Sequence, residues 1–438
     1  MVKRSLLVAA LLICLPATLF AQYDYVRISN PFLHKIPIAV PLFMPLSGTE
    51  PETMAAQSGA DLLAETLEFT RYFNLINRAA FLEQPDRTGG TLADIHCKNW
   101  RDIGAEFLIT GGVTVAGGIM EMELRLFDVF KERMILGKKY KGKSEDQRKM
   151  IRRFCMEVME QLTGTPGIFE SSIAFISTGD GSKEIYACEF DGYNPQRITR
   201  NSSINLSPAW SSDGQWLAYT SYRKGGPDLY ITHLTENRGT VFSKEGINIA
   251  PSWVPGQFML AATLSFEGDQ EIYLLTGSGT VVRRLTRSWG IDVSPSFSPD
   301  GKRMAFVSGR AGSPQIFVMD LASGRTERLT FEGGYNTNPS WNPLNDTIAY
   351  CAMTGGVFNI HVIDVETGTT VTLTADQGDN ESPSWSPDGS LIAFSSTREA
   401  GVSRIYVMTA AGTDPRRLLI LPGEQTGPKW SPAVAAGR

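Results

Sequence analysis

The stretch Ser294-Pro295-Ser296-Phe297-Ser298-Pro299-Asp300-Gly301 decides the fold of this 438-residue chain. Its first half predicts a short strand. Its second half is typical of a tight turn, because proline presets φ and glycine accepts the open conformation. Two short apolar runs follow at residues 304–307 and 315–319, and a polar run ends at residues 328–330. Four strands joined by turns predict one antiparallel sheet.

The same phrase occurs six times in the last three-fifths of the chain. Each copy has an aromatic anchor with a proline two residues before it, and successive anchors are 43 to 45 residues apart. The six anchors are Trp210, Trp253, Phe297, Trp341, Trp385 and Trp430. Repeats of this length, built from short strands and turns, are typical of β-propeller blades. The sequence therefore predicts a six-bladed β-propeller. Its proline-containing strands should lie beside the central channel, where a strand has a free edge.

The repeat is out of phase at its two ends. The second, third and fourth strands appear six times from Ile173 onward, whereas the first Pro-x-Trp strand begins at Pro208 and the last ends at Trp430. We therefore expect the C-terminal strand to pair with the first blade and close the ring, which removes open sheet edges. This interpretation assigns residues 168–438 to the propeller.

Residues 22–165 do not repeat, and they predict a small α/β domain. The last helix of this domain is the clearest, since Ser144-Glu145-Asp146-Gln147 fits a capping box and Gly164 is a suitable end. The other helices are expected at residues 52–70 and 92–103. Strands are expected at residues 36–43, 73–77, 106–113, 120–130 and 134–141. The short segment 164–167 should restrict the orientations that the two domains can adopt.

The N-terminus has the features of a secretory signal peptide. Lys3 and Arg4 precede an apolar core at residues 6–15, and the small residue Ala21 stands at the expected cleavage site. The core is too short to span a membrane as a helix. The sequence therefore predicts export, with residues 1–21 removed and the mature chain beginning at Gln22.

The cysteines are scattered along the chain. Of the five, Cys97, Cys155, Cys188 and Cys351 remain after the expected cleavage. Export permits disulfides, but Cys188 and Cys351 fall in strands of different blades, which favours buried free thiols. A bond between Cys97 and Cys155, which share the first domain, is the alternative that sequence leaves open.

The search for catalytic or metal-binding patterns finds little. No Gly-x-Ser-x-Gly nucleophile motif is present, and the four histidines show neither helical i, i+4 spacing nor metal-ligand spacing. The net charge is −5 with dispersed basic residues, which argues against nucleic-acid binding. We therefore expect no catalytic residue, no metal and no cofactor.

One polar pattern survives this search. Five residues before each anchor stands an amide or a carboxylate. These residues are Asn205, Asn248, Asp292, Asn336, Asn380 and Gln425. Six-fold repetition predicts a polar ring near one end of the channel, suited to a peptide or loop inserted from outside. The alternative interpretation is that such residues simply start strands and tolerate tight turns. A trapped cation has little support, because only Asp292 is charged.

The whole chain resembles the TolB family, the periplasmic component of the Tol–Pal system. The blades read Ser-Pro-Ala/Ser-Trp-Ser-x-Asp-Gly and end in Arg-Leu-Thr, a pattern shared with propellers of prolyl-oligopeptidase-like peptidases. The first domain adds residues 37–43 and 103–111, which look like strand motifs of the family. The combination of this domain with these blades makes the resemblance specific.

The resemblance implies a non-enzymatic adaptor in the periplasm. TolB-like proteins bind the lipoprotein Pal through the propeller mouth and TolA through the mature N-terminus, and they support outer-membrane integrity and constriction at cell division. Other outer-membrane proteins are further candidate partners. Carried onto this chain, the Pal-facing positions include Ala250, Asp292, Val293 and Ser294. The TolA-contacting segment is residues 22–28, of which Tyr25, Val26, Arg27 and Ile28 look most like the family. Charge reversal at Asp292 is expected to abolish Pal binding with the fold intact.

Two alternatives stand beside this hypothesis. The first is an exported propeller enzyme, such as a polysaccharide lyase, or a propeller accessory to a peptidase. An enzyme of this kind requires a channel mouth lined by histidine or carboxylate side chains. The second is an exported repeat protein that binds an unidentified ligand.

Overall fold

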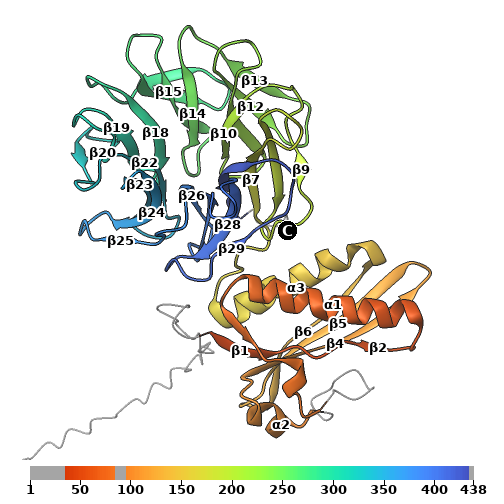
Figure 1. Ribbon diagram of the computed structural model, residues 1–438. Coiled ribbons are helices and arrows are strands. Elements are labelled where there is room, and N and C mark those ends of the chain that lie inside the picture. Colours follow the sequence, from red (N-terminus) through yellow and green to blue (C-terminus); the bar gives the residue numbers. More distant parts are fainter. Residues whose placement is uncertain (1–34, 84–94, 434–438) are drawn as a thin grey trace, which may run out of the picture.

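The computed structural model describes residues 35–83 and 95–433, which form an α/β domain followed by a six-bladed β-propeller (Figure 1). The predicted fold class is confirmed. The expected signal peptide, the segment 22–28 and the expected start of a helix at residue 92 lie outside the described residues.

The α/β domain is a sheet with helices on both faces. The strand order is β3-β1-β4-β5-β6, with β2 beside β4; the contacts of β1 with β3 and β4 are parallel, and β4, β5 and β6 are antiparallel. The elements are β1 (Ile36–Ala39), β2 (Met44–Pro45), α1 (Glu50–Phe69), β3 (Phe73–Leu75), α2 (Cys97–Asp102), β4 (Phe107–Ala116), β5 (Ile119–Asp128), β6 (Arg133–Lys143) and α3 (Gln147–Thr163). Alternate residues of β4 face opposite cores. Ile109 packs with the residues of α1 and α3, and Leu108 packs with Trp100 of α2.

Two local predictions for this domain need correction. The strand expected over residues 36–43 ends at Ala39, and Pro41, which has no N–H to donate, lies in the irregular segment before β2. Ser144 does not cap α3, because its hydroxyl donates to the Gly118 carbonyl at 3.3 Å and it belongs to a short 3-10 turn. Gly164 ends α3 in the left-handed conformation, as predicted.

The propeller consists of six four-stranded antiparallel sheets, numbered here as blades 1 to 6. Blade 1 combines β30 (Gln425–Trp430) with β7 (Ser172–Ser177), β8 (Glu184–Glu189) and β9 (Gln196–Arg197). Blade 2 is β10 (Asn205–Trp210), β11 (Trp216–Ser221), β12 (Asp228–His233) and β13 (Gly239–Phe242); blade 3 is β14 (Asn248–Trp253), β15 (Met259–Leu264), β16 (Glu271–Thr276) and β17 (Val281–Arg284). Blade 4 is β18 (Asp292–Phe297), β19 (Arg303–Ser308), β20 (Gln315–Asp320) and β21 (Thr326–Arg328). Blade 5 is β22 (Asn336–Trp341), β23 (Thr347–Thr354), β24 (Val357–Asp364) and β25 (Thr370–Thr372); blade 6 is β26 (Asn380–Trp385), β27 (Leu391–Ser396), β28 (Arg404–Thr409) and β29 (Arg416–Arg417).

Each innermost strand contains a bulge at the residue before its proline. The pairing register with the second strand shifts at this point in all six blades. The residue before the proline has a φ of 51° to 58° at Ser207, Ala250, Ser294, Asn338, Ser382 and Gly427. Five of these six residues carry a side chain in the left-handed region, which costs about 1 kcal/mol or more each. The bulge therefore belongs to the repeat itself and re-aims the strand at the channel.

Anchor tryptophans join neighbouring blades. The indole N–H of Trp253 donates to the carbonyl of Ala209 at 3.1 Å, and that of Trp385 donates to the carbonyl of Ser340 at 3.0 Å. The indole of Trp210 donates in the same way to the carbonyl of Lys429 at 2.9 Å. Each bond connects one innermost strand to the next, so the ring is linked beside the channel as well as by packing between the sheets.

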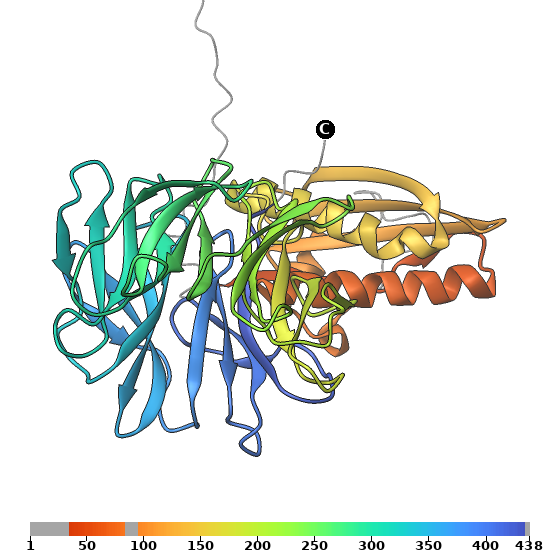
Figure 2. The same ribbon diagram turned by 90° about the horizontal axis from the view of Figure 1, so that it is seen from above.

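The α/β domain packs against one sector of the ring and does not lie across its central opening (Figure 1); Figure 2 shows the same pairing of the two bodies from above. Arg148 of α3 donates to Glu189 at 2.9 Å and to Asp191 at 2.5 Å. Arg416 donates to the carbonyl of Phe69 and lies 3.8 Å from the centre of its ring. These contacts hold the two bodies together in addition to the short linker.

The four cysteines of the described residues are free and buried. The prediction of buried free thiols is confirmed, and the bond between Cys97 and Cys155 is not formed. Burial raises the pKa of each of these thiols.

Candidate partner-binding site at the propeller mouth

The channel contains two hollows along the six innermost strands. One hollow, of about 280 Å³, lies at the end where these strands begin and is lined by the bulge residues and their prolines. The other, of about 400 Å³, lies at the opposite end and is lined by the aromatic anchors. We call the first end the mouth and the second the far end. The α/β domain contacts the turns after β8 and β28, which lie at the far end, so the mouth faces away from it.

The predicted polar ring does not form an accessible rim. The side chains of Asn205, Asn248, Asp292, Asn336, Asn380 and Gln425 are all fully or almost fully buried. Their hydrogen bonds are internal. The amide of Asn205 donates to Glu184 of the preceding blade at 3.2 Å, and its oxygen accepts from Ser221 of its own blade at 2.8 Å. The amides of Asn336 and Asn380 likewise donate to the preceding blade, whereas Asp292 and Gln425 bond mainly to their own blade and the loop before it. The interpretation as strand-starting residues therefore describes the contacts of this set better.

Asp292 is the charged member of this set, and it is not a surface charge. Its carboxylate accepts from Arg310 at 2.7 Å and from the Ser288 hydroxyl at 3.1 Å. Burial raises the pKa of Asp292, whereas the hydrogen bond from Ser308 and the charge of Arg310 act in the opposite direction. Charge reversal at Asp292 would place a lysine against Arg310 inside the protein, so we expect it to destabilise the fold, and it is not a clean test of a binding surface.

The residue immediately before each buried residue forms the rim instead. These six residues are Ile204, Ile247, Ile291, Tyr335, Asp379 and Glu424. Their equivalence is visible in the backbone, since each carbonyl accepts an N–H from the segment that follows the second strand of its own blade, as Ile291 does from Gly309 at 2.9 Å. Ile204, Ile291 and Tyr335 are 46%, 40% and 42% exposed. The rim is thus apolar over blades 2 to 5 and acidic at blades 6 and 1.

More apolar side chains stand in the loops that lead to the same end. Trp289 and Ile420 are 71% and 85% exposed. Large exposed apolar side chains gathered at one end of a protein indicate an interaction surface. Sequence reasoning missed this set because it followed the repeated polar residue. The strand alternation around that residue was the available signal, since neighbours of a buried residue face the other way.

The other predicted positions are placed as follows. Ala250 and Ser294 line the mouth hollow, and Val293 is partly buried against the core between blades 4 and 5. Residues Tyr25, Val26, Arg27 and Ile28 lie outside the described residues. Of the positions that the resemblance implies, Ala250 and Ser294 thus line the channel and Asp292 is internal.

The lining of the channel consists mainly of serine, proline and aromatic side chains, with one lysine among the described residues. Among the described residues, neither hollow has a histidine or a carboxylate in its lining. No group of three or more His, Cys, Asp or Glu side chains with metal-binding geometry occurs within residues 35–83 and 95–433. His233 packs edge-on against Trp216, and His361 stacks on Tyr350, so both are packed strand residues. Within the same part of the chain, no helix combines the length and apolar character that a membrane span needs.

Comparison with known proteins agrees with this architecture along the whole chain. Residues 24–135 match the TolB amino-terminal domain, and residues 159–434 match the TolB beta propeller domain. The Tol-Pal system protein TolB of Desulfosudis oleivorans is 96% identical over 438 residues, covering 100% of each chain. A protein TolB homolog of Chlorobium chlorochromatii is 41% identical over 291 residues, 65% of each chain. The crystal structure of TolB from Acinetobacter baumannii has a TM-score of 0.78 at 26% identity and covers 91% of this chain and 97% of that chain. The chain therefore belongs to the TolB family of periplasmic Tol–Pal system proteins.

Proposed function

We propose that this protein is a non-catalytic adaptor of the Tol–Pal system that binds the lipoprotein Pal through the propeller mouth and TolA through its mature N-terminus. In this role it supports outer-membrane integrity and constriction at cell division. The observation that carries the Pal-binding part is the rim, where exposed apolar side chains surround a hollow that faces away from the α/β domain. Membership in the Tol–Pal system implies protein partners, and the rim is suited to bind a protein partner.

The composition of the rim supports a protein partner over a small molecule. Buried apolar and aromatic side chains carry most of the energy in protein interfaces, and Trp289 and Tyr335 are residues of the kind that dominate there. Asp379 and Glu424 give the opposite side of the rim a negative charge. We therefore expect the partner to present an apolar loop toward blades 2 to 5 and basic side chains toward blades 6 and 1.

The test is calorimetric titration of the mature protein, residues 22–438, with the soluble domain of Pal from the same organism. The substitution I291D places a charge in the apolar part of the rim and should weaken binding by about tenfold or more. The matched control is L344D. Leu344 is 65% exposed and lies in the turn after β22, at the far end of the ring. Equal affinities for the two variants would refute the assignment of the mouth, and failure of the unaltered protein to bind would refute Pal binding itself.

The proposed TolA contact is tested independently of the propeller. Deletion of residues 22–28 should abolish binding to the soluble domain of TolA and leave the affinity for Pal within about twofold. The motif Tyr25-Val26-Arg27-Ile28 alternates in a way that suits addition of a strand to a partner sheet. Retention of full TolA affinity by the shortened protein would refute this part of the proposal.

A further inference from the structure

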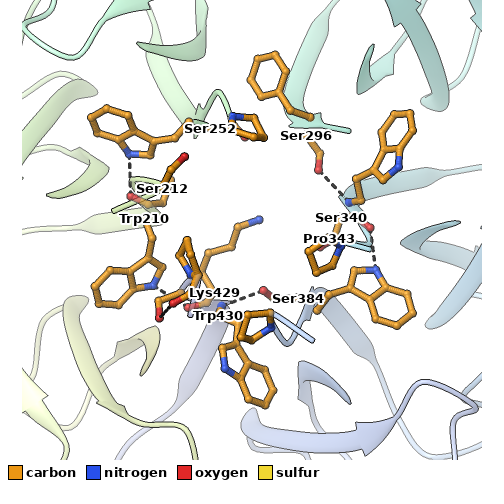
Figure 3. Close-up of a pocket in the computed structure, with 18 of the residues that line it drawn as sticks. Trp210, Ser212, Ser252, Ser296, Ser340, Pro343, Ser384, Lys429 and Trp430 are labelled. Atoms are coloured by element: carbon orange, nitrogen blue, oxygen red, sulfur yellow. Dashed lines mark hydrogen bonds between the residues drawn. The ribbon is translucent and has the colours of Figure 1, made fainter. Parts of the chain in front are cut away.

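One position in the channel breaks the six-fold pattern with a charge. The residue before each anchor is Ala209, Ser252, Ser296, Ser340, Ser384 or Lys429. Five of these residues are small, and the sixth is a lysine. Figure 3 shows the Lys429 side chain reaching into the open space between the innermost strands. Lys429 lines both the far-end hollow and the mouth hollow.

The amine of Lys429 has no counter-charge within the described part of the chain. None of the ion pairs found there includes Lys429, and no hydrogen bond from its Nζ is present. The side chain of Lys429 is half-buried, and the strands around it lower the pKa of Lys429, with no carboxylate acting on it. An ammonium group that is partly removed from water and has no partner gains from a bound anion, which supplies both a hydrogen-bond acceptor and a counter-charge.

Hydroxyl donors stand around the same space. The Ser296 oxygen accepts the backbone N–H of Trp341 at 3.0 Å, and the Ser384 oxygen accepts that of Trp430 at 2.9 Å (Figure 3). Each oxygen therefore accepts a hydrogen bond on one side, both serines line the far-end hollow, and no hydrogen bond donated by either hydroxyl is found among the described residues. Ser252 and Ser340 line the same hollow. An amine surrounded by hydroxyl donors is a donor set for an anion.

We propose that the propeller channel binds a carboxylate group at the amine of Lys429. The hollow of about 400 Å³ admits a small carboxylate or the end of an acidic side chain. The group has two sources, a free small molecule or an Asp or Glu side chain that the bound partner inserts through the mouth. Only the second source rests on the proposed function. The same amine repels cations, so a metal ion is not the expected occupant.

The experiment uses the mature protein labelled with ¹³C-lysine. The signal of the Lys429 ε-methylene group is the one missing from the variant K429S, which carries the residue found at this position in four other blades. Acetate is titrated at constant ionic strength, and a saturable shift of this signal is expected, without comparable shifts of other lysines. K302S is the control, because Lys302 is 79% exposed and lies outside the channel lining. No saturable shift, or an equal shift of many lysine signals, would overturn the proposal.

The source of the carboxylate is decided by titration of the same proteins with the soluble domain of Pal. If the partner supplies the group, K429S lowers the affinity by about tenfold or more, K302S does not, and Pal displaces acetate. If the carboxylate is a free molecule, acetate binds Lys429 while Pal binds K429S and the unaltered protein equally. If Pal does not bind at all, the proposed function fails, and the acetate shift still decides the inference about Lys429.

Discussion

The pair formed by Arg310 and Asp292 has a neutral twin two blades away, which allows the cost of a buried charge to be measured. In blade 4, Arg310 donates to Ser308 at 2.8 Å and to Asp292 at 2.7 Å. In blade 6, Arg398 donates to Ser396 at 2.9 Å and to Asn380 at 3.0 Å. Both guanidinium groups also lie over two aromatic rings of their own blade. The pairs differ chiefly in the charge of the acceptor.

Replacement of each arginine by methionine should therefore give two different losses of stability. R398M removes hydrogen bonds to a neutral amide and should lower the free energy of unfolding by about 1–2 kcal/mol. R310M leaves the carboxylate of Asp292 buried without its cation and should lower it by about 3–5 kcal/mol. The loss of aromatic contacts is common to both variants and cancels in the comparison. The double variant D292N/R310M should recover most of the difference, because it removes the unpaired charge.

Urea unfolding of the four proteins, followed by tryptophan fluorescence, measures these losses. Repetition at lower pH adds a second check. Burial already raises the pKa of Asp292, and loss of Arg310 raises it further. A carboxyl group with a raised pKa stabilises the fold most below its unfolded pKa of about 4, and this stability is lost as the pH rises through the folded pKa. The penalty of R310M should thus shrink on acidification from pH 7 to pH 4, and that of R398M should not. Equal losses for R310M and R398M at pH 7 would refute the reasoning.

Other positions give further tests. W385F removes the hydrogen bond from the indole to the Ser340 carbonyl at 3.0 Å and should lower the free energy of unfolding in urea by about 1 kcal/mol. Phe297 occupies the equivalent position in blade 4, so a phenyl ring can pack there. An unchanged free energy of unfolding would contradict a stabilising role for the bond. A250V should lower the free energy of unfolding by about 1–2 kcal/mol, because Ala250 has a φ of 51°, whereas A250G should not lower it. A glycine variant less stable than the valine variant would disprove the strain at the bulge. R148A removes the bonds to Glu189 and Asp191 and should make the linker at residues 164–167 more sensitive to limited proteolysis. R153A on the same helix is the control, because Arg153 is 69% exposed. The thiols of residues 22–438 should not react with Ellman's reagent before unfolding, because burial raises the pKa of each, and rapid reaction at pH 8 would show an accessible thiolate.

The repeat made the propeller predictable from sequence. A strand of four residues gives little information alone, but six copies at equal spacing leave one architecture that accommodates them. Reliance on the residues that all six copies share failed to predict the candidate binding surface. A residue repeated six times is selected for what every blade needs, and Asn205, Asn336 and Asn380 meet a need of this kind by bonding to the preceding blade. The burial of these residues depends on which way a bulged strand turns its side chains, and that direction cannot be read from the residues alone.

The less regular domain shows a different limit. The helix ending at Gly164 was predictable because a terminating glycine has one backbone role. The start of the same helix was not predictable, because the Ser144 hydroxyl bonds to the Gly118 carbonyl and not to the first turn of the helix. The pairing of β5 with β6 brings this carbonyl within reach. Contacts of this sort join residues far apart in the chain and have no local signature.

In a ring of equivalent blades, specific recognition must arise where the blades differ. Equivalent residues placed around a six-fold axis give every side of the channel the same chemistry, and such a channel cannot fix the orientation of an asymmetric partner. Two of the departures from equivalence near the axis change its polarity or charge. The rim changes from apolar at Ile291 to acidic at Asp379, and among the described residues the channel lining carries one amine, that of Lys429. Both departures can orient a loop that enters the mouth, because a loop with apolar side chains on one side and basic side chains on the other makes both contacts in one orientation and loses them in the others. The residues that interrupt the repeat are therefore the residues on which the specificity of this propeller should depend.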